Sequence, residues 1–233
     1  VVLVISPWNY PFYQAIAPCM LSFVCGNATV YKPSEYTPLK NLVEDLLKSS
    51  EFDPHWVQVV YGDGVLGEEL IQAGPSKVFF TGSVRTGKKV MESASKKLIP
   101  VLLELGGKDS MIVFEDVNLK RATAGALWGA LTNCGQACTS VERLYVNKTI
   151  LPDFRSELVN QLDRIKQDSS NDWDCDLGVM TTSDQVQVVR EQLQEAKDLG
   201  AKITFTKKRE WDFTSPTIPP ALIENLPKHA RLW

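Results

Sequence analysis

The sequence lacks a hydrophobic run long enough to cross a membrane. Its longest apolar stretch, Ala15–Cys25, contains Pro18 and falls well short of the roughly 20 residues that a spanning helix needs. No secretory signal is visible at the amino terminus. An excess of one charge is also lacking, because 25 basic and 28 acidic residues give a net charge of −3. We therefore expect neither nucleic acid nor an anionic membrane as a partner.

Cysteine is sparse, with 5 residues among the 233 of the chain. An odd, sparse set does not suit a disulfide framework and indicates a reducing compartment, so we expect a cytoplasmic protein. In that setting an important cysteine is more often a nucleophile than a cross-link. No metal site is expected.

What the sequence does contain is an alternation of short apolar runs with amphipathic stretches. This alternation is typical of βαβ units and predicts an α/β protein with an open parallel sheet. In the first half it predicts strands at residues 1–5, 28–31, 57–61, 77–80 and 100–105. It predicts helices there at residues 14–24, 37–48 and 84–96.

The character of the sequence changes after Gly106 and Gly107. Two adjacent glycines suit a hinge, so we predict one domain over residues 1–107 and a second over residues 108–233. The second domain is expected to contain strands at 110–114, 141–146 and 202–206, a buried helix at 119–131, and charged helices at 151–167 and 183–199. Because the chain opens inside a strand-like run without a starting methionine, we expect it to be part of a longer protein.

Cys138 is the first candidate for chemistry. It follows a predicted helix and precedes a predicted strand, and Gly135 permits a turn between them. A thiolate on such a turn would be partly exposed, and neighbouring backbone N–H groups could stabilise a developing oxyanion. The alternative is that Cys138 is a small buried hydrophobic residue, as most free cysteines are.

Glu104 is the second candidate, because it interrupts an otherwise apolar run at the end of a predicted strand. Desolvation at such a position would tune its carboxylate for work as a general base. The alternative is that the neighbouring leucines are buried while Glu104 points to solvent, as acidic side chains usually do.

The segment Ser6–Pro11 follows the first predicted strand. In an open parallel sheet, ligands bind beyond the carboxyl ends of the strands. The Asn9 amide could donate to an oxyanion there, and Trp8 could form one wall of a substrate pocket. The alternative is a proline-bounded loop with a packed tryptophan.

Two further strand ends could hold a nucleotide. Lys32 and Glu35 follow the second strand, where a carboxylate can accept from a ribose hydroxyl and a lysine can donate to one. Gly82, Ser83 and Gly87 open the helix after the fourth strand, where free N–H groups and the helix dipole suit a phosphate. The G-x-G-x-x-G fingerprint is lacking after the first strand. These residues therefore predict a nucleotide site without naming a reaction.

Taken together, five segments resemble the aldehyde dehydrogenase superfamily. In the order and with the approximate spacing of that family, the chain contains Pro7-Trp-Asn-Tyr-Pro11, Lys32-Pro-Ser-Glu35, Phe80-Thr-Gly-Ser83 with Gly87, Leu103-Glu-Leu-Gly-Gly-Lys108 and Gly135-Gln-Ala-Cys138. The resemblance covers nearly the whole chain. It also accounts for the missing fingerprint, because the family binds its dinucleotide without that turn.

The resemblance implies a Rossmann-like dinucleotide-binding domain over residues 1–107 and part of a catalytic domain over residues 108–233. It implies oxidation of a small-molecule aldehyde to a carboxylic acid with NAD(P), by a full-length protein that is a homo-oligomer. Cys138 would be the nucleophile and Glu104 the base that activates the hydrolytic water. The oxyanion hole would consist of the Asn9 amide and the backbone N–H of Cys138.

For the cofactor, the resemblance implies that Lys32 and Glu35 bind the adenine ribose. Ser83 would bind the pyrophosphate, and Trp8 would lie near the cofactor and the substrate. Glu35 favours NAD because a carboxylate repels a 2′-phosphate, although some family members also accept NADP.

Two alternatives remain. An acylating dehydrogenase would pass the acyl group to coenzyme A instead of water, and a non-enzymatic relative would keep only the fold and a bound dinucleotide. The presence of both Cys138 and Glu104 favours the hydrolytic enzyme. A disulfide between Cys134 and Cys138 that switches activity off is a further hypothesis. The sequence shows no charged anchor for an acidic or amino-substituted substrate, so we expect aliphatic or broad-range aldehydes.

Overall fold

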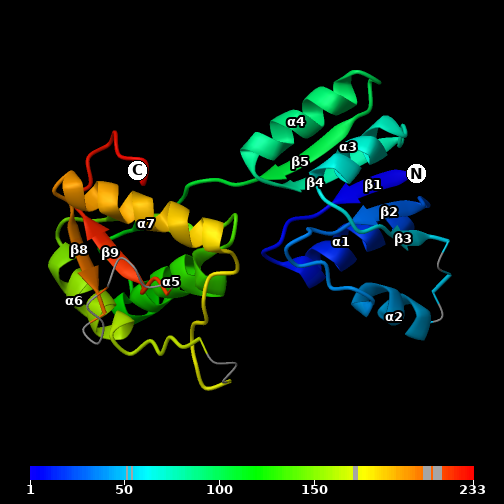
Figure 1. Ribbon diagram of the computed structural model, residues 1–233. Coiled ribbons are helices and arrows are strands. Elements are labelled where there is room, and N and C mark those ends of the chain that lie inside the picture. The colour runs from blue at the N-terminus through cyan, green and yellow to red at the C-terminus, as the bar shows by residue number, and fades with distance from the viewer. Residues whose placement is uncertain (51, 54, 170–172, 207–210, 212–216) are drawn as a thin grey trace. The chain divides into compact units, whose positions relative to one another are not determined.

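The computed structural model describes residues 1–50, 52–53, 55–169, 173–206, 211 and 217–233. The chain divides into two compact units, Val1–Gly106 and Gly107–Trp233, which we call the first and second units (Figure 1). Each unit combines helices with a parallel strand pairing, so the predicted α/β class is confirmed. Among the described residues, no helix is both long enough and apolar enough to cross a membrane.

The first unit is built on a five-stranded parallel sheet in the order β3-β2-β1-β4-β5. Its strands are β1 (Val2–Ile5), β2 (Thr29–Lys32), β3 (Val57–Val59), β4 (Lys77–Gly82) and β5 (Val101–Leu105). The chain winds outward from β1 in both directions, so the order of strands reverses between β1 and β4. Ligands of open parallel sheets bind beyond the carboxyl ends of the strands at such a point.

Helices cover both faces of this sheet (Figure 1). One face carries α1 (Pro11–Val24) and α2 (Leu42–Ser49), and the other carries α3 (Gly64–Gln72) and α4 (Val84–Ser95). Successive side chains of a strand point to opposite faces, which decides the packing. Leu3 and Ile5 of β1 therefore pack toward α3 and α4, whereas Val4 packs toward α1 and α2.

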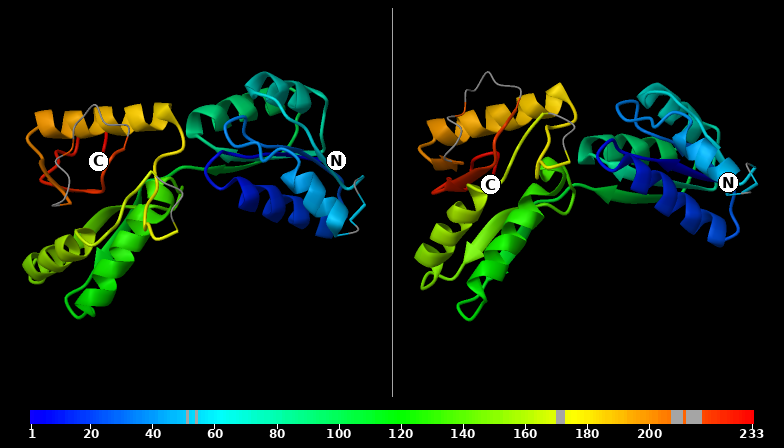
Figure 2. Two further views of the ribbon diagram at one scale, coloured as in Figure 1. Left: turned by 60° about the horizontal axis from the view of Figure 1, so that its bottom comes forward. Right: turned by 90° about the horizontal axis from the view of Figure 1, so that it is seen from below.

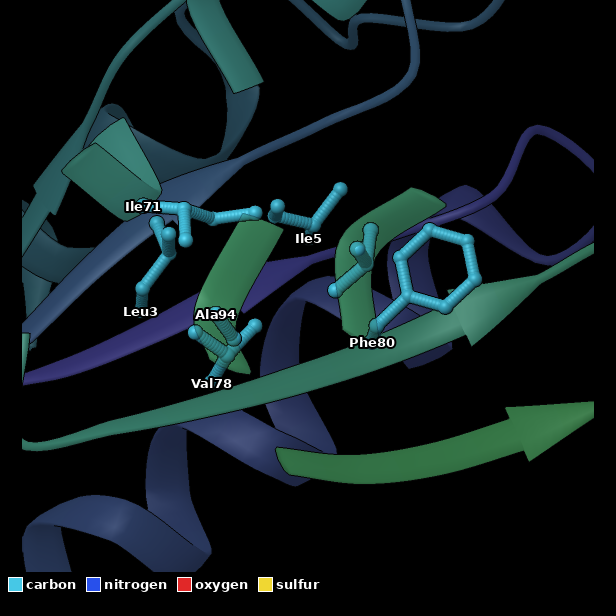
Figure 3. Close-up of a cluster of buried hydrophobic side chains, with 7 residues drawn as sticks. Leu3, Ile5, Ile71, Val78, Phe80 and Ala94 are labelled. Atoms are coloured by element: carbon cyan, nitrogen blue, oxygen red, sulfur yellow. The ribbon is translucent and has the colours of Figure 1, made fainter. Parts of the chain in front are cut away.

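The core between the sheet and α3 and α4 is shown in Figure 3. It consists of buried apolar side chains from two strands and two helices, labelled there as Leu3, Ile5, Ile71, Val78, Phe80 and Ala94. The β1–β4 register places Ile5 opposite Phe80. Burial of each larger side chain stabilises the unit by roughly 1.5–3 kcal/mol relative to exposure.

Three helices of the first unit differ from the prediction. Helix α1 begins at Pro11 instead of residue 14, because proline suits the first position of a helix. The predicted start of α2 at residue 37 is wrong, since Leu39 and Asn41 have φ values of 47° and 68° in the left-handed region. Helix α3 was not predicted, although Asp63 caps it by accepting hydrogen bonds from the first helical N–H groups.

The second unit contains a parallel pair and an antiparallel pair of strands. The parallel pair is β6 (Asp109–Val113) with β7 (Val141–Val146), and the antiparallel pair is β8 (Lys202–Phe205) with β9 (Ala221–Glu224). The helices are α5 (Leu119–Leu131), α6 (Leu151–Leu162) and α7 (Ser183–Asp198), and a short 3-10 turn, η1 (Thr132–Gly135), follows α5. Helices α5 and α6 lie side by side (Figure 2).

The core of the second unit lies between β6, α5 and α6, where Val113, Ala126, Phe154 and Leu158 are buried. Helix α5 has the predicted bounds but is only half-buried, since Trp128 is 75% exposed. Helix α6 ends at Leu162, five residues before the predicted end, and β9 was not predicted. The boundary between the units falls at the two glycines proposed as a hinge.

Candidate active site

Cys138 is exposed and lies on a turn between η1 and β7. The backbone N–H of Ser140 donates to the Ala137 carbonyl at 3.1 Å and closes this turn. The buried Ser140 hydroxyl donates to the Gly135 carbonyl, also at 3.1 Å. The Cys138 sulfur therefore lies on a turn that hydrogen bonds stabilise. Because Cys138 is exposed, the alternative of a buried hydrophobic cysteine is wrong.

The backbone just before Cys138 has an unusual conformation. Asn133, Cys134 and Gly135 all lie in the left-handed region, with φ values of 53°, 58° and 74°. This conformation costs a non-glycine residue roughly 1–2 kcal/mol. At Gly135 a Cβ atom would also lie 3.1 Å from the Ala130 carbonyl oxygen, so glycine is required there. Hydrogen bonds elsewhere in the loop must offset this strain.

Gln136 supplies several of those hydrogen bonds. Its backbone N–H and its side-chain Nε2 both donate to the Asn133 carbonyl, at 3.1 Å and 2.9 Å. Its Oε1 accepts from the backbone N–H of Thr181 at 2.9 Å. The loop that carries Cys138 is thus tied to the segment that leads into α7.

Cys134 faces the same segment, with its sulfur 3.7 Å from the Val179 carbonyl oxygen. Burial raises the pKa of the Cys134 thiol, and the nearby Cys175 raises it further. Cys134 and Cys138 are both free thiols in the structure. A disulfide between them stays a prediction.

The linker residues at the start of the second unit lie against the Cys138 turn. A Cβ atom on Gly107 would lie 3.8 Å from the Cys138 carbonyl oxygen. Arg143 donates to the Lys108 carbonyl at 2.6 Å, and the Lys108 ammonium pairs with Glu142. These contacts hold the first residues of the second unit beside the Cys138 turn.

In the first unit, the segment after β1 contains Trp8 and Asn9, both half-buried. The Ser6 N–H donates to the Lys32 carbonyl at 3.1 Å and extends the pairing of β1 with β2. The Thr37 hydroxyl donates to the Trp8 carbonyl at 2.9 Å. The loop is therefore held over the end of β2.

Lys32 is 3% exposed at the end of β2, an unusual burial for a lysine. Its ammonium donates to the Pro33 carbonyl at 3.1 Å and lies 3.6 Å from the Glu35 carboxylate. A Cβ atom on Gly67 would lie 3.7 Å from the Lys32 side chain, so the lysine stem packs on α3. The Glu35 side chain is half-exposed beside it.

Ser83 is the N-cap of α4, and its hydroxyl oxygen accepts from the Thr86 N–H at 3.1 Å. The exposed start of this helix offers N–H groups and the positive end of the helix dipole to an anion. Gly87 has a packing role, because a Cβ atom there would lie 2.7 Å from Leu105 of β5. As cofactor-binding residues, Gly82, Ser83 and Gly87 remain predictions.

Glu104 is exposed, whereas Leu103 and Leu105 pack toward the core. Of the two interpretations of this run, the structure therefore supports the one in which Glu104 points to solvent, and the desolvation is not observed. The strand alternates, and Glu104 lies on the face that these two leucines do not share. Glu104 is paired in register with Thr81 of β4, near the carboxyl end of the sheet.

The chain matches the aldehyde dehydrogenase family over residues 1–233. It belongs to that family. It is 44% identical over 219 residues to 4,4′-diapolycopene aldehyde oxidase of Methylomonas sp, a match that covers 94% of this chain and 41% of that protein. It is 38% identical over 201 residues to 4-trimethylaminobutyraldehyde dehydrogenase of Bos taurus, covering 85% of this chain and 41% of that protein.

Solved aldehyde dehydrogenase structures share its fold. A 3,6-anhydro-L-galactose dehydrogenase in complex with NAP has a TM-score of 0.90 at 30% identity, covering 99% of this chain and 50% of the other. Betaine aldehyde dehydrogenase from Staphylococcus aureus in complex with NAD+ has a TM-score of 0.87 at 30% identity, covering 99% and 47%. The chain thus spans half or less of the length of these relatives.

The structure brings most of the predicted site residues to one edge of the first unit's sheet. These residues lie at or just beyond the carboxyl ends of parallel strands: Trp8, Asn9, Lys32, Glu35, Gly82, Ser83 and Glu104. Cys138 belongs to the second unit. In the described part of the chain, no group of three or more His, Cys, Asp or Glu residues could hold a metal ion.

Sequence reasoning missed the residues that hold the Cys138 turn. Gln136 lies inside the Gly135–Cys138 motif, but no role was assigned to it. Ser140 lies just beyond the motif. The sequence feature that could have indicated them is the presence of hydrogen-bonding side chains on both sides of Cys138, in a loop where Gly135 implies a strained backbone.

Proposed function

We propose that the protein is an NAD(P)-dependent aldehyde dehydrogenase that oxidises an aldehyde to a carboxylic acid through a thioester on Cys138. The observation that carries this proposal is the exposed Cys138 thiol on a hydrogen-bonded turn, in a chain that belongs to the family. A thiol in this setting is accessible to a substrate and fixed in direction, as a nucleophile needs to be.

In the proposed reaction, the Cys138 thiolate adds to the aldehyde carbon and forms a tetrahedral adduct. The Asn9 amide and the Cys138 backbone N–H donate to its oxyanion. A dinucleotide held by the first unit would supply the acceptor for the hydride of this adduct, and Cys138 would then carry the acyl group as a thioester. Glu104 takes a proton from a water molecule, which attacks the thioester and releases the acid and the thiol.

This mechanism requires residues from both units. Asn9 and Glu104 belong to the first unit and Cys138 to the second. We propose that the first unit binds the dinucleotide and the second supplies the nucleophile. An exposed Glu104 suits this role, since a base must reach water before the bound substrate excludes the surrounding solvent.

The residues of the first unit fit a dinucleotide. A buried lysine ammonium has three donors, and Lys32 directs one to a backbone carbonyl, which leaves capacity for ribose hydroxyls beside Glu35. The start of α4 at Ser83 suits the pyrophosphate. We propose NAD as the preferred cofactor, because the Glu35 carboxylate would repel the 2′-phosphate of NADP.

The substrate is proposed to be an uncharged aldehyde, aliphatic or of broad range. Residues 1–31 and 122–141, which contain Asn9 and Cys138, include no Asp, Glu, Lys, Arg or His. A charged substrate tail would find no ionic partner in these segments. The named relatives include an enzyme for a neutral carotenoid aldehyde and others for trimethylammonium aldehydes, and this composition favours the neutral class.

Family membership also supports a homo-oligomeric protein. The five cysteines are all free in the structure, which supports a reducing compartment such as the cytoplasm. Both statements are proposals for the whole protein.

Replacement of the nucleophile tests the proposal. In Cys138→Ala, expressed from the whole gene, we expect NADH formation from a panel of neutral aldehydes to fall below detection, while NAD binding measured by calorimetry stays within about twofold of that of the parent. Cys25→Ala is the matched control, because Cys25 is also exposed but lies in the first unit. Full turnover by Cys138→Ala would remove Cys138 from the mechanism.

A further inference from the structure

We infer that Gln136 is a positioning residue for Cys138, and that its amide fixes the turn of the nucleophile from two sides. The inference rests on the proposed role of Cys138 as nucleophile. It concerns a different residue, whose side-chain amide hydrogen-bonds to the backbone of Asn133 and of Thr181, both in the second unit.

The first side is the strained backbone before the turn. A carbonyl oxygen has two acceptor positions, and the Asn133 carbonyl receives both the N–H and the Nε2 of Gln136. Asn133 and Cys134 have backbone conformations in the left-handed region, which are unfavourable for non-glycine residues. These hydrogen bonds stabilise that conformation. The side chain of Gln136 thus stabilises the turn that precedes Cys138.

The second side is a rigid anchor. Gln136 Oε1 accepts from the N–H of Thr181, whose neighbour Thr182 is the N-cap of α7. Helix α7 spans Ser183–Asp198 and buries Val186, Leu193 and Ala196, so its start is a fixed point of the second unit. Through Gln136, the Cys138 loop is connected to that point.

Cys138 lies between two residues whose side chains hydrogen-bond to the backbone, Gln136 before it and Ser140 after it. The Ser140 hydroxyl binds the Gly135 carbonyl, which closes the loop on its other end. A nucleophile must approach its target carbon within a narrow range of distance and angle, and a displacement of about 1 Å can slow a reaction about 100-fold. Loss of the Gln136 amide should therefore slow thioester formation without removing the thiol.

Two variants separate the two sides. Gln136→Met has a similar length and loses the side-chain hydrogen bonds to the Asn133 carbonyl and the Thr181 N–H. Gln136→Glu keeps an acceptor for the Thr181 N–H and loses the donor to Asn133. Gln187→Met is the matched control, because Gln187 is an exposed glutamine of α7 that bonds to Glu191.

The experiment combines two measurements on the protein expressed from its whole gene. Rapid mixing with NAD and a neutral aldehyde gives the rate of the first NADH formed, and alkylation with iodoacetamide followed by peptide mapping reports each thiol. For Gln136→Met we expect the first rate to fall roughly 10- to 100-fold. Alkylation of Cys138 should stay at least as fast as in the parent, and buried Cys19 should stay unmodified. The rate of first NADH formation in Gln136→Glu should lie between that of Gln136→Met and that of the parent. In Gln187→Met this rate should match that of the parent.

The outcomes distinguish this inference from the proposed function. A parental rate in Gln136→Met overturns the inference. So does a slow rate accompanied by alkylation of Cys19, since the variant would then be unfolding instead of misplacing one thiol. Retained aldehyde oxidation in Cys138→Ala overturns the proposed function itself, independently of Gln136.

Discussion

Among single residues, the buried polar side chains of the first unit are the most sensitive to pH. Tyr31 is 1% exposed in the core beneath α1, and burial raises the pKa of its hydroxyl to about 12. Burial likewise raises the pKa of the neighbouring Cys19 thiol to about 12. Both groups keep their protons in the folded state at a pH where they would lose them in the unfolded state.

This difference predicts a loss of stability in alkali. Stability from Tyr31 should be fully present below about pH 10, the pKa of an unfolded tyrosine, and should be lost as the pH rises toward 12. Urea unfolding at pH 9 and pH 11 should therefore show a smaller decline for Tyr31→Phe than for the parent. Tyr36→Phe, at an exposed tyrosine, is the control. An equal decline in Tyr31→Phe and the parent would contradict the assignment.

Single residues also show where sequence reasoning succeeds and fails. The residues made Cys138, Asn9 and Glu104 candidates, and the family resemblance assigned their roles, which stay predictions. The sequence also predicted a partly exposed turn at Cys138, and Cys138 is exposed. For Glu104 the sequence left two interpretations open, desolvation among the leucines and exposure to solvent. The structure shows the exposed one, because the side chains of β5 alternate between two faces. Gln136 escaped notice because its partner at Thr181 is 45 residues away in the sequence.

At the level of elements, the packing of α4 on the sheet depends on a close approach at a glycine. Gly87 is buried, and an added Cβ atom would lie 2.7 Å from a Leu105 methyl carbon and 3.6 Å from the Phe80 ring. A larger residue here would require the Leu105 side chain to move. The start of α4 at Ser83 is thereby held near the end of β4, where a pyrophosphate is proposed to bind.

Gly87→Ala is expected to destabilise the first unit. Overpacking of a core costs typically 1–3 kcal/mol, which should outweigh the roughly 1 kcal/mol that alanine gains in a helix. Gly125→Ala in α5 is the matched control, because its Cβ would meet nothing within 4 Å and should stabilise the protein slightly. Urea unfolding measures both changes. A Gly87→Ala protein as stable as Gly125→Ala would refute the packing role.

The elements themselves were mostly predictable, and the errors have local causes. Strong period-two and helical patterns gave β7 and α5 with their observed bounds. Helix α2 starts later than expected, because two residues after Pro38 adopt left-handed conformations that propensity does not reveal. Helix α3 was missed although Asp63 is a favourable N-cap, since its apolar residues give a weak pattern.

For the whole molecule, periodicity predicted the α/β class but could not give the strand order. The order β3-β2-β1-β4-β5 depends on pairings between strands far apart in the sequence, such as β1 with β4. That order places the proposed dinucleotide residues at one edge of the sheet. The family motifs predicted a Rossmann-like dinucleotide-binding domain, and the strand order came from the structure.

The account as a whole depends on a thioester at Cys138 that Glu104 hydrolyses. Glu104→Gln should leave thioester formation intact and slow its hydrolysis, since loss of a general base typically costs 100-fold or more. The same Glu104→Gln variant tests the alternative in which coenzyme A accepts the acyl group. If that alternative holds, added coenzyme A should release the acyl group from Cys138. Glu68→Gln, at an exposed glutamate of α3, is the control.

The most direct measurement is an acid quench of Glu104→Gln, expressed from the whole gene, during turnover with NAD and a neutral aldehyde. The quenched protein is digested and analysed by mass spectrometry, while NADH is followed in parallel. We predict a burst of NADH comparable to the enzyme concentration, and the acyl group of the substrate attached to Cys138. An active protein with unmodified Cys138, an acyl group on another residue, or equal slowing of both steps would contradict the account.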